Sequence, residues 1–254
     1  MATTISVHSF RRGTGKSSLA ANLAALLAMQ GQQVGLVDAA LRSPGLHMFF
    51  RLNEGRIGRT LNDYVRGKCD IEQTAIDVTP AQHAPNGRLW FVPASSDLLE
   101  IAHLLRAGWN IEALASGFQT LNDALALDTL LVDTHTGLDE EMLSVLALAD
   151  SLLILLRPDK QDYQGTAVLV EVARRLGIRN MALIINEVPP TIDLELIRTE
   201  VERTYGYPVV GVLPHTNELT ILASNDLFVV RHPDHPLTTL LRQMVAVLRT
   251  QGLV

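Results

Sequence analysis

A short segment near the amino terminus, Ser9 to Ser18 (SFRRGTGKSS), combines glycines, hydroxyl groups and basic side chains. Its end, Gly15-Lys16-Ser17, satisfies the last part of the phosphate-loop pattern GxxxxGK[ST], whereas Phe10 occupies the position of the first glycine. In such a loop the lysine reaches the β- and γ-phosphates, and the hydroxyl group of Ser17 binds magnesium. The residues expected to contact a phosphate-bearing cofactor are Arg12, Gly13, Thr14, Gly15, Lys16, Ser17 and Ser18.

The segments on both sides of this loop have the pattern that a phosphate site requires. The run TTISVHS predicts a strand before the loop, and KSSLAANLAALLAMQ predicts a helix after it. The amide groups and the dipole of the helix N-terminus would then face bound phosphates. For the loop taken alone, an ordinary glycine-containing turn capped by serine is the alternative.

Two aspartates end apolar runs elsewhere in the chain. Asp38 lies at the end of QVGLVD before a Ser-Pro-Gly turn, and Asp133 lies at the end of LDTLLVD before Thr-His-Thr-Gly. The carboxyl ends of neighbouring parallel strands face the same crevice, so both carboxylates are expected beside the loop. Together with Ser17 they would bind magnesium there, although either aspartate alone is also suited to cap a helix.

A fold must hold these residues in place, and the sequence pattern predicts a fold of the α/β class. Short β-rich runs alternate with longer apolar-periodic segments, which indicates a mostly parallel central sheet of about seven or eight strands with helices on both faces. Strands are expected at Thr3 to Ser9, Gln33 to Val37, Arg88 to Pro93, Thr129 to Asp133, Ser151 to Leu156, Met181 to Asn186 and Val209 to Leu213. Helices are expected at Lys16 to Gln30, Asp97 to Arg106, Ile111 to Ala126, Asp139 to Leu148, Gln161 to Leu176, Ile192 to Tyr205, Glu218 to Ser224 and Pro236 to Thr250. Residues 51 to 87, rich in glycine and proline, are expected to leave the sheet.

Length and composition narrow the class of protein. The chain has 254 residues, a formal net charge of −6 and one cysteine, Cys69. We expect a single domain over residues 1–254, without a disulfide framework or a thiolate cage for zinc or iron–sulfur clusters. Neither a signal peptide nor a run of about 18 apolar residues is evident, which favours a soluble, cytoplasmic protein.

The loop and the two strand-end aspartates resemble the MinD/ParA family of dimeric ATPases, whose deviant Walker A loop reads KGGxGK[ST]. The aligned residues here are RRGTGKS, and the likeness continues through RPDKQDYQGTAV, IINEVP and GVLPHTNEL, over nearly the whole chain. The resemblance implies a P-loop NTPase fold of the SIMIBI type, ATP and Mg²⁺ as cofactors, and a homodimer that sandwiches ATP. It makes Asp38 the switch I aspartate and Asp133 the Walker B aspartate.

The same resemblance implies that Asn186 and Pro214 contact adenine. Asn186 is also compatible with a turn, and Pro214 with the end of a strand. It also implies a catalytic set of Lys16, Arg11 and Asp38, because the family has a signature lysine at the position of Arg11 that reaches the partner's nucleotide. Arg11 could neutralise phosphate charge in the same way, or it could be too long for a close interface. Arg12 stands where the family has a glycine. It could be a second phosphate contact or a solvent-facing residue.

The largest departure from the family is Ala40, which stands where the switch I pattern DxD has a second carboxylate that helps to position or activate the attacking water. Losing such a group costs about 10² to 10⁴ in rate, whereas ATP binding depends on the loop. The sequence therefore predicts slow hydrolysis and a long-lived ATP-bound dimer. Alanine here is also the substitution that would be engineered to trap that state, and the sequence is compatible with either origin.

The resemblance favours an ATP-dependent dimerising switch that positions or partitions a cargo. The alternatives are a hydrolysis-deficient ATP-binding adaptor and a structural dimerisation module. Expected partners are a protein activator or cargo adaptor. Nonspecific DNA and a membrane surface are weaker alternatives, which would recruit the protein to the nucleoid or the inner membrane. For DNA the candidates are Arg42, Arg51, Arg56, Arg59, Arg66 and Lys68, although a solvated surface is the favoured interpretation. The last helix has an amphipathic pattern, for which core packing is favoured over membrane binding.

Overall fold

The computed structural model describes residues 2–53, 55–108 and 110–254. Within these residues, eight strands form one sheet in the order β3-β4-β2-β5-β1-β6-β7-β8. Neighbouring strands are parallel except for the edge pair β3 and β4. The strands are β1 (Thr3–His8), β2 (Gln33–Ala39), β3 (Ile76–Asp77), β4 (Arg88–Val92), β5 (Thr129–Thr134), β6 (Ser151–Leu156), β7 (Asn180–Val188) and β8 (Val209–Pro214).

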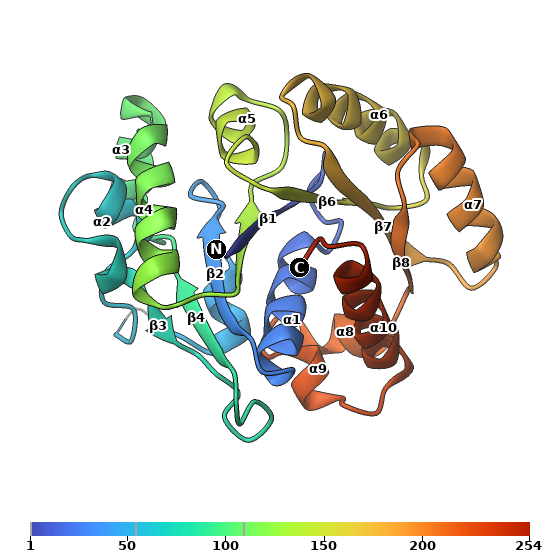
Figure 1. Ribbon diagram of the computed structural model, residues 1–254, viewed down its shortest axis with the longest axis horizontal. Coiled ribbons are helices and arrows are strands. Elements are labelled where there is room, and N and C mark those ends of the chain that lie inside the picture. Colours follow the sequence, from blue (N-terminus) through green and yellow to red (C-terminus); the bar gives the residue numbers. More distant parts are fainter. Residues whose placement is uncertain (1, 54, 109) are drawn as a thin grey trace.

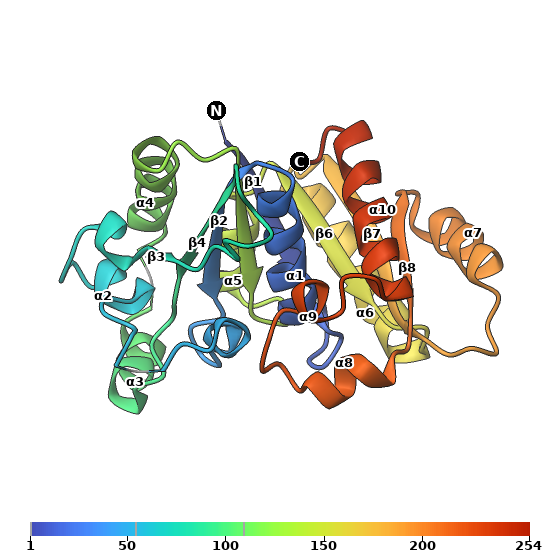
Figure 2. The same cartoon turned by 90° about the horizontal axis from the view of Figure 1, so that it is seen from below.

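Helices cover both faces of this sheet (Figures 1 and 2). One face carries α1 (Lys16–Met29), α8 (Asn217–Leu222), α9 (Phe228–Arg231) and α10 (Pro236–Thr250). The other carries α2 (Leu61–Val65), α3 (Leu98–Ala107), α4 (Ile111–Ala124), α5 (Glu140–Leu146), α6 (Lys160–Arg175) and α7 (Leu194–Tyr205). Two 3₁₀ helices, η1 (Leu46–Phe50) and η2 (Ile71–Thr74), lie in the connections. The predicted α/β fold with helices on both faces is confirmed.

The apolar strands divide their side chains between two cores. In β6, whose six residues SLLILL are all buried, Leu153 and Leu155 pack with α1 and α10. Leu152, Ile154 and Leu156 face the opposite side and join the core beneath α4 to α7. Because successive side chains of a strand point to opposite faces, a continuous apolar run suits a strand that is covered on both sides.

The expected strands and long helices occur where the sequence predicts them, with ends shifted by up to two residues. The stretch from 51 to 87 contains more regular structure than expected, namely α2, η2 and β3. The edge strand β3 has only two residues, and α2 has five. Elements this short span too few residues to show a hydrophobic period, which is also why α9 was not predicted.

The order of the strands brings three loops together. β1 lies between β5 and β6, and β2 lies on the other side of β5. The loops that follow β1, β2 and β5 therefore meet at the carboxyl edge of the sheet, toward the end of the molecule where α8 lies in Figure 2. In the pairing of β2 with β5, Asp38 is in register with Asp133.

Helix α10 is part of the core. Its apolar side chains Leu237, Leu241, Met244, Val245 and Leu248 are at most 4% exposed and pack in the same cluster as those of α1. The interpretation of this helix as core packing is confirmed. Among the helices of the described residues, none combines the length and apolar character that a membrane span requires.

Candidate functional site

The loop from Ser9 to Gly15 depends on two glycines and on a contact with β7. Gly13 and Gly15 adopt left-handed φ angles of +76° and +90°, which glycine tolerates best. Gly15 is also held in a close contact, because a Cβ atom there would lie 2.3 Å from Asn186 Nδ2. Asn186 in turn donates a hydrogen bond of 2.7 Å to the carbonyl oxygen of Thr14. The end of β7 therefore supports the loop that precedes α1.

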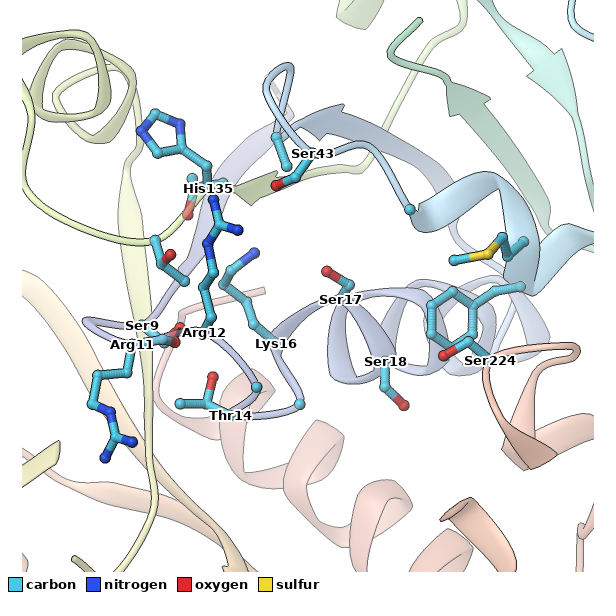
Figure 3. A pocket seen from close by; sticks show the side chains of 18 residues that line it. Ser9, Arg11, Arg12, Thr14, Lys16, Ser17, Ser18, Ser43, His135 and Ser224 are labelled. Atoms are coloured by element: carbon cyan, nitrogen blue, oxygen red, sulfur yellow. Dashed lines mark hydrogen bonds between the residues drawn. The ribbon is translucent and has the colours of Figure 1, made fainter. Parts of the chain in front are cut away.

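A cavity of about 310 Å³ opens in front of the loop (Figure 3). Its walls come from the loop and the start of α1, from the segment after β2 and from the segment after β5. They are formed by Ser9, Arg11, Arg12, Gly13, Thr14, Gly15, Lys16, Ser17, Ser18, Ala40, Ser43, Gly45, Met48, Phe49, Thr134, His135, Thr136 and Ser224. None of these described lining residues carries a carboxylate, whereas three carry permanent positive charges. The surface of the cavity therefore suits an anion.

Lys16 and Asp133 form a buried ion pair at the base of the cavity. The Nζ–Oδ1 distance is 2.5 Å, and the two side chains are 7% and 1% exposed. The second carboxylate oxygen of Asp133 is buried and has no hydrogen-bond partner among the described residues. The structure thus brings the predicted phosphate-binding lysine and the predicted Walker B aspartate together, with one acceptor oxygen still available.

Asp38 is fixed by the segment that follows it. Its Oδ1 accepts a hydrogen bond from the Ala40 amide at 3.1 Å, and its Oδ2 accepts bonds from the Gly45 and Leu46 amides at 3.1 and 3.2 Å. Burial, and then the negative charge of Asp133, raises the pKa of Asp38 to about 6. The carboxylate of Asp38 therefore shapes the wall that contains Ala40 and Gly45.

Ala40 lies in this wall and is 6% exposed. Its methyl group stands where the family resemblance leads one to expect a carboxylate. His135, on the wall formed after β5, was not selected from the sequence. Its Nε2 lies 2.8 Å from Asp139 Oδ2, and its Nδ1 is buried without a partner among the described residues. The sequence signal was present, because His135 follows Asp133 by two positions.

A second histidine, His8, lies beneath the loop at the end of β1. Its Nδ1 is 2.7 Å from the hydroxyl oxygen of Thr134, and the side chain is fully buried. Burial, and then the charges of Lys16 and His135, lowers the pKa of His8 to about 3. His8 is therefore neutral under physiological conditions, and it joins β1 to β5 directly under the site.

The first half of the loop is attached to α6. A Cβ atom on Gly165 of α6 would lie 2.0 Å from the Phe10 ring, so the ring occupies the space that a side chain would fill. Arg11 Nη1 donates to both carboxylate oxygens of Asp159, at 3.0 and 3.2 Å. The Asp162 amide, together with Arg11 and Arg157, holds the pKa of Asp159 below its usual value. Phe10, at the position of the missing glycine, thus has a packing role.

The two positions expected to contact adenine lie together behind the loop. Asn186 and Pro214 border a narrow space of about 20 Å³ between Ser18 and Phe228. Only about one water molecule fits such a volume, so a purine would require these walls to separate. The adenine contact stays a prediction.

The candidate DNA-binding residues are mostly held in ion pairs. Arg42 pairs with Asp139 and Glu141, and Arg51 pairs with Asp226. Arg66 and Lys68 share Glu100. Their charge is partly neutralised within the protein, which supports the solvated-surface interpretation.

The residues present fit Mg²⁺ accompanied by a nucleotide. The structure offers the hydroxyl oxygen of Ser17 and the oxygens of Asp38 and Asp133, which are the hard donors that Mg²⁺ prefers. Within the described residues, no group of three His, Cys, Asp or Glu side chains is arranged to hold a metal by itself. This donor set therefore suits an ion that also takes ligands from phosphate and water.

Residues 5–229 match the family model of the CobQ/CobB/MinD/ParA nucleotide binding domain. The chain belongs to this family. It is 27% identical over 247 residues to an uncharacterized ATP-binding protein of Methanocaldococcus jannaschii, covering 97% of this chain and 87% of the relative. It is 26% identical over 220 residues to the septum site-determining protein MinD of Synechocystis, covering 85% of this chain and 77% of the relative.

Solved structures of the family have the same fold. The cell division ATPase MinD of Pyrococcus furiosus superimposes with a TM-score of 0.82 at 19% identity, covering 98% of this chain and 99% of that one. A putative plasmid partition protein of Borrelia burgdorferi bound to AMPPNP gives a TM-score of 0.79 at 17% identity, covering 99% and 100%. The predicted MinD/ParA resemblance and the predicted fold are confirmed.

Proposed function

We propose that this protein is an ATP-dependent switch of the MinD/ParA type. It binds Mg-ATP at the Ser9 to Ser18 loop, associates with a second copy while ATP is bound, and positions or partitions a cargo in the cytoplasm. The observation that carries the proposal is that the glycine loop and Lys16 line one anion-suited cavity, while Asp133 pairs with Lys16 and Asp38 lies in register with Asp133. Relatives named as septum site-determining proteins, and neighbours named as plasmid partition proteins, support the positioning role.

The residues of the chain have distinct roles in this proposal. Main-chain amides of residues 13 to 18 and the dipole of α1 hold the phosphates, and Lys16 neutralises their charge. Ser17, Asp38 and Asp133 hold Mg²⁺, which when bound would neutralise charge on the phosphate oxygens. Asn186 keeps the loop in shape through its bond to Thr14. The partner would be a protein activator or cargo adaptor, as the MinC:MinD complex of Aquifex aeolicus illustrates for a neighbour in fold.

Hydrolysis in this protein is proposed to be slow. The cavity lining lacks a carboxylate among its described residues, and Ala40 has no group that orients water. The second candidate function is that of a hydrolysis-deficient ATP-binding adaptor. The alanine at position 40 in the cavity wall favours it.

Calorimetric titration with Mg-ATP tests the nucleotide site. We expect saturable binding by the wild-type protein and at least a hundredfold weaker binding by Lys16→Ala, since a buried charge-assisted contact is lost. Circular dichroism establishes that the variant is folded. Absence of binding by the wild type at millimolar Mg-ATP would overturn the proposal. Full affinity in Lys16→Ala would do so as well.

A further inference from the structure

The two arginines ahead of the loop glycines differ in what they contact. Arg11 is paired with Asp159 and also lies 3.4 Å from Asp162 Oδ1. Arg12, in contrast, makes no hydrogen bond or ion pair with any other residue that the structure describes. In Figure 3 the Arg12 guanidinium lies on the same side of the loop as the Lys16 ammonium, whereas Arg11 points the opposite way. The cavity therefore receives an arginine that lacks a counter-ion in the part of the chain that the structure describes.

The charges around the cavity indicate that Arg12 would bind an anion. Lys16 is already matched by Asp133, and no described lining residue brings a carboxylate close to Arg12. Among the described lining residues, Arg12 thus carries the positive charge that has no counter-ion. A guanidinium presents a planar fork of donors that fits phosphate oxygens, and it stays charged at every physiological pH.

Arg11 could contact a phosphate in the cavity only by giving up its contacts with Asp159 and Asp162. The Asp162 side chain is 2% exposed, and its Oδ1 accepts no hydrogen bond from the described residues. Arg11 is the cation closest to that oxygen. Moving Arg11 away would leave a buried carboxylate oxygen poorly compensated.

We propose that Arg12 contacts the terminal phosphate of ATP held by its own subunit, and so sets a preference for ATP over ADP. Arg11 is instead the positioning residue that attaches the loop to α6. This inference rests on the proposed function, because it requires a nucleotide in the loop. According to this inference, a single subunit recognises the third phosphate of ATP without a contribution from its partner.

The test compares the affinities of Mg-ATP and Mg-ADP in wild type, Arg12→Ala, Arg12→Lys and Arg11→Ala. Protein is kept at a concentration where sedimentation velocity shows monomers. We expect Arg12→Ala to lose roughly tenfold to a hundredfold in ATP affinity, as for one charge-assisted contact, and about twofold or less in ADP affinity. Arg12→Lys should retain part of the preference. Its melting temperature should match the wild type, whereas that of Arg11→Ala should fall by several degrees.

The outcomes separate this inference from the proposed function. If the wild type binds ATP and Arg12→Ala keeps the same ratio of ATP to ADP affinity, the role of Arg12 is wrong while the nucleotide site stands. If Arg12→Ala weakens ATP binding only at concentrations where dimers form, Arg12 acts across an interface and the single-subunit role is overturned. A wild type that binds neither nucleotide overturns both.

Discussion

At the scale of residues, the wall built around Asp38 is the basis of the proposed slow hydrolysis. Asp38 accepts three main-chain hydrogen bonds, which fix its carboxylate in this wall. Ala40, whose amide makes one of those bonds, presents a methyl group to the cavity. The described lining is therefore cationic, and position 40 adds no carboxylate to it, which is the basis of the proposed slow hydrolysis.

Restoring a carboxylate at position 40 tests this assignment. We expect Ala40→Asp to raise ATP turnover by about 10² to 10⁴, because a water-orienting group returns to the wall. Phosphate release at saturating Mg-ATP measures the rate, and Ala40→Asn is the uncharged control of similar size. Equal rates in wild type and Ala40→Asp would show that the missing carboxylate does not limit hydrolysis.

At the scale of elements, the contact between the loop and α6 decides where the first half of the loop lies. Gly165 leaves space for the Phe10 ring, and Asp159 at the start of the same helix binds Arg11. Asp159 also caps α6, because its side chain accepts hydrogen bonds from the Gln161 and Asp162 amides. One carboxylate thus joins the start of the helix to the loop.

Filling that space should disturb the loop from a distance. We expect Gly165→Ala to destabilise the protein by about 1 to 3 kcal/mol, because an aromatic ring at this distance from the new methyl group must move. Affinity for both nucleotides should fall along with stability. Thermal melting and nucleotide titration measure the two effects. Val168→Ala, at a half-exposed position of the same helix, is the matched control. A Gly165→Ala protein with wild-type melting and affinity would contradict a positioning role for Phe10.

The sequence predicted the parts of the site that follow one another along the chain. The glycine loop, Lys16 and the two strand-end aspartates each stand beside a strong apolar pattern, and the parallel-sheet rule placed them together. The attachment of Arg11 was not predicted, because its partner Asp159 lies 148 positions further along the chain. The same strand-end rule, applied to the residues after β6, would have placed Asp159 near the loop. The orientations of Arg11 and Arg12 depend on side-chain packing, which no periodicity records.

At the scale of the whole molecule, His8 makes stability depend on pH. The pKa of His8 is about 3 in the folded protein and near 6.5 in the unfolded chain, so only the unfolded chain gains a proton between these values. The contribution of neutral His8 is therefore present above pH 6.5 and is lost as the pH falls toward 3. Asp38 acts in the opposite direction, because its raised pKa makes its burial less costly as the pH falls from above 6 to below 4.

A His8→Asn variant isolates the histidine. Asparagine can keep the hydrogen bond to Thr134 but does not titrate. Between pH 7.5 and pH 5 the wild type should lose about 2 kcal/mol more of its free energy of unfolding than the variant. Chemical denaturation at both pH values measures this, and the effect of Asp38 cancels in the difference. Parallel losses in the two proteins would mean that His8 is charged or solvated in the folded state.

The burial of α10 affects how truncated forms of this protein should be interpreted. In a chain where a terminal amphipathic helix lay on the surface, its deletion would remove one recruitment signal and leave a folded remainder. Here the deletion would uncover the apolar side of α1 and β8, and aggregation is the expected result. Loss of cargo positioning after such a truncation would report misfolding. Recruitment should therefore be mapped with exposed point substitutions that leave the melting curve unchanged.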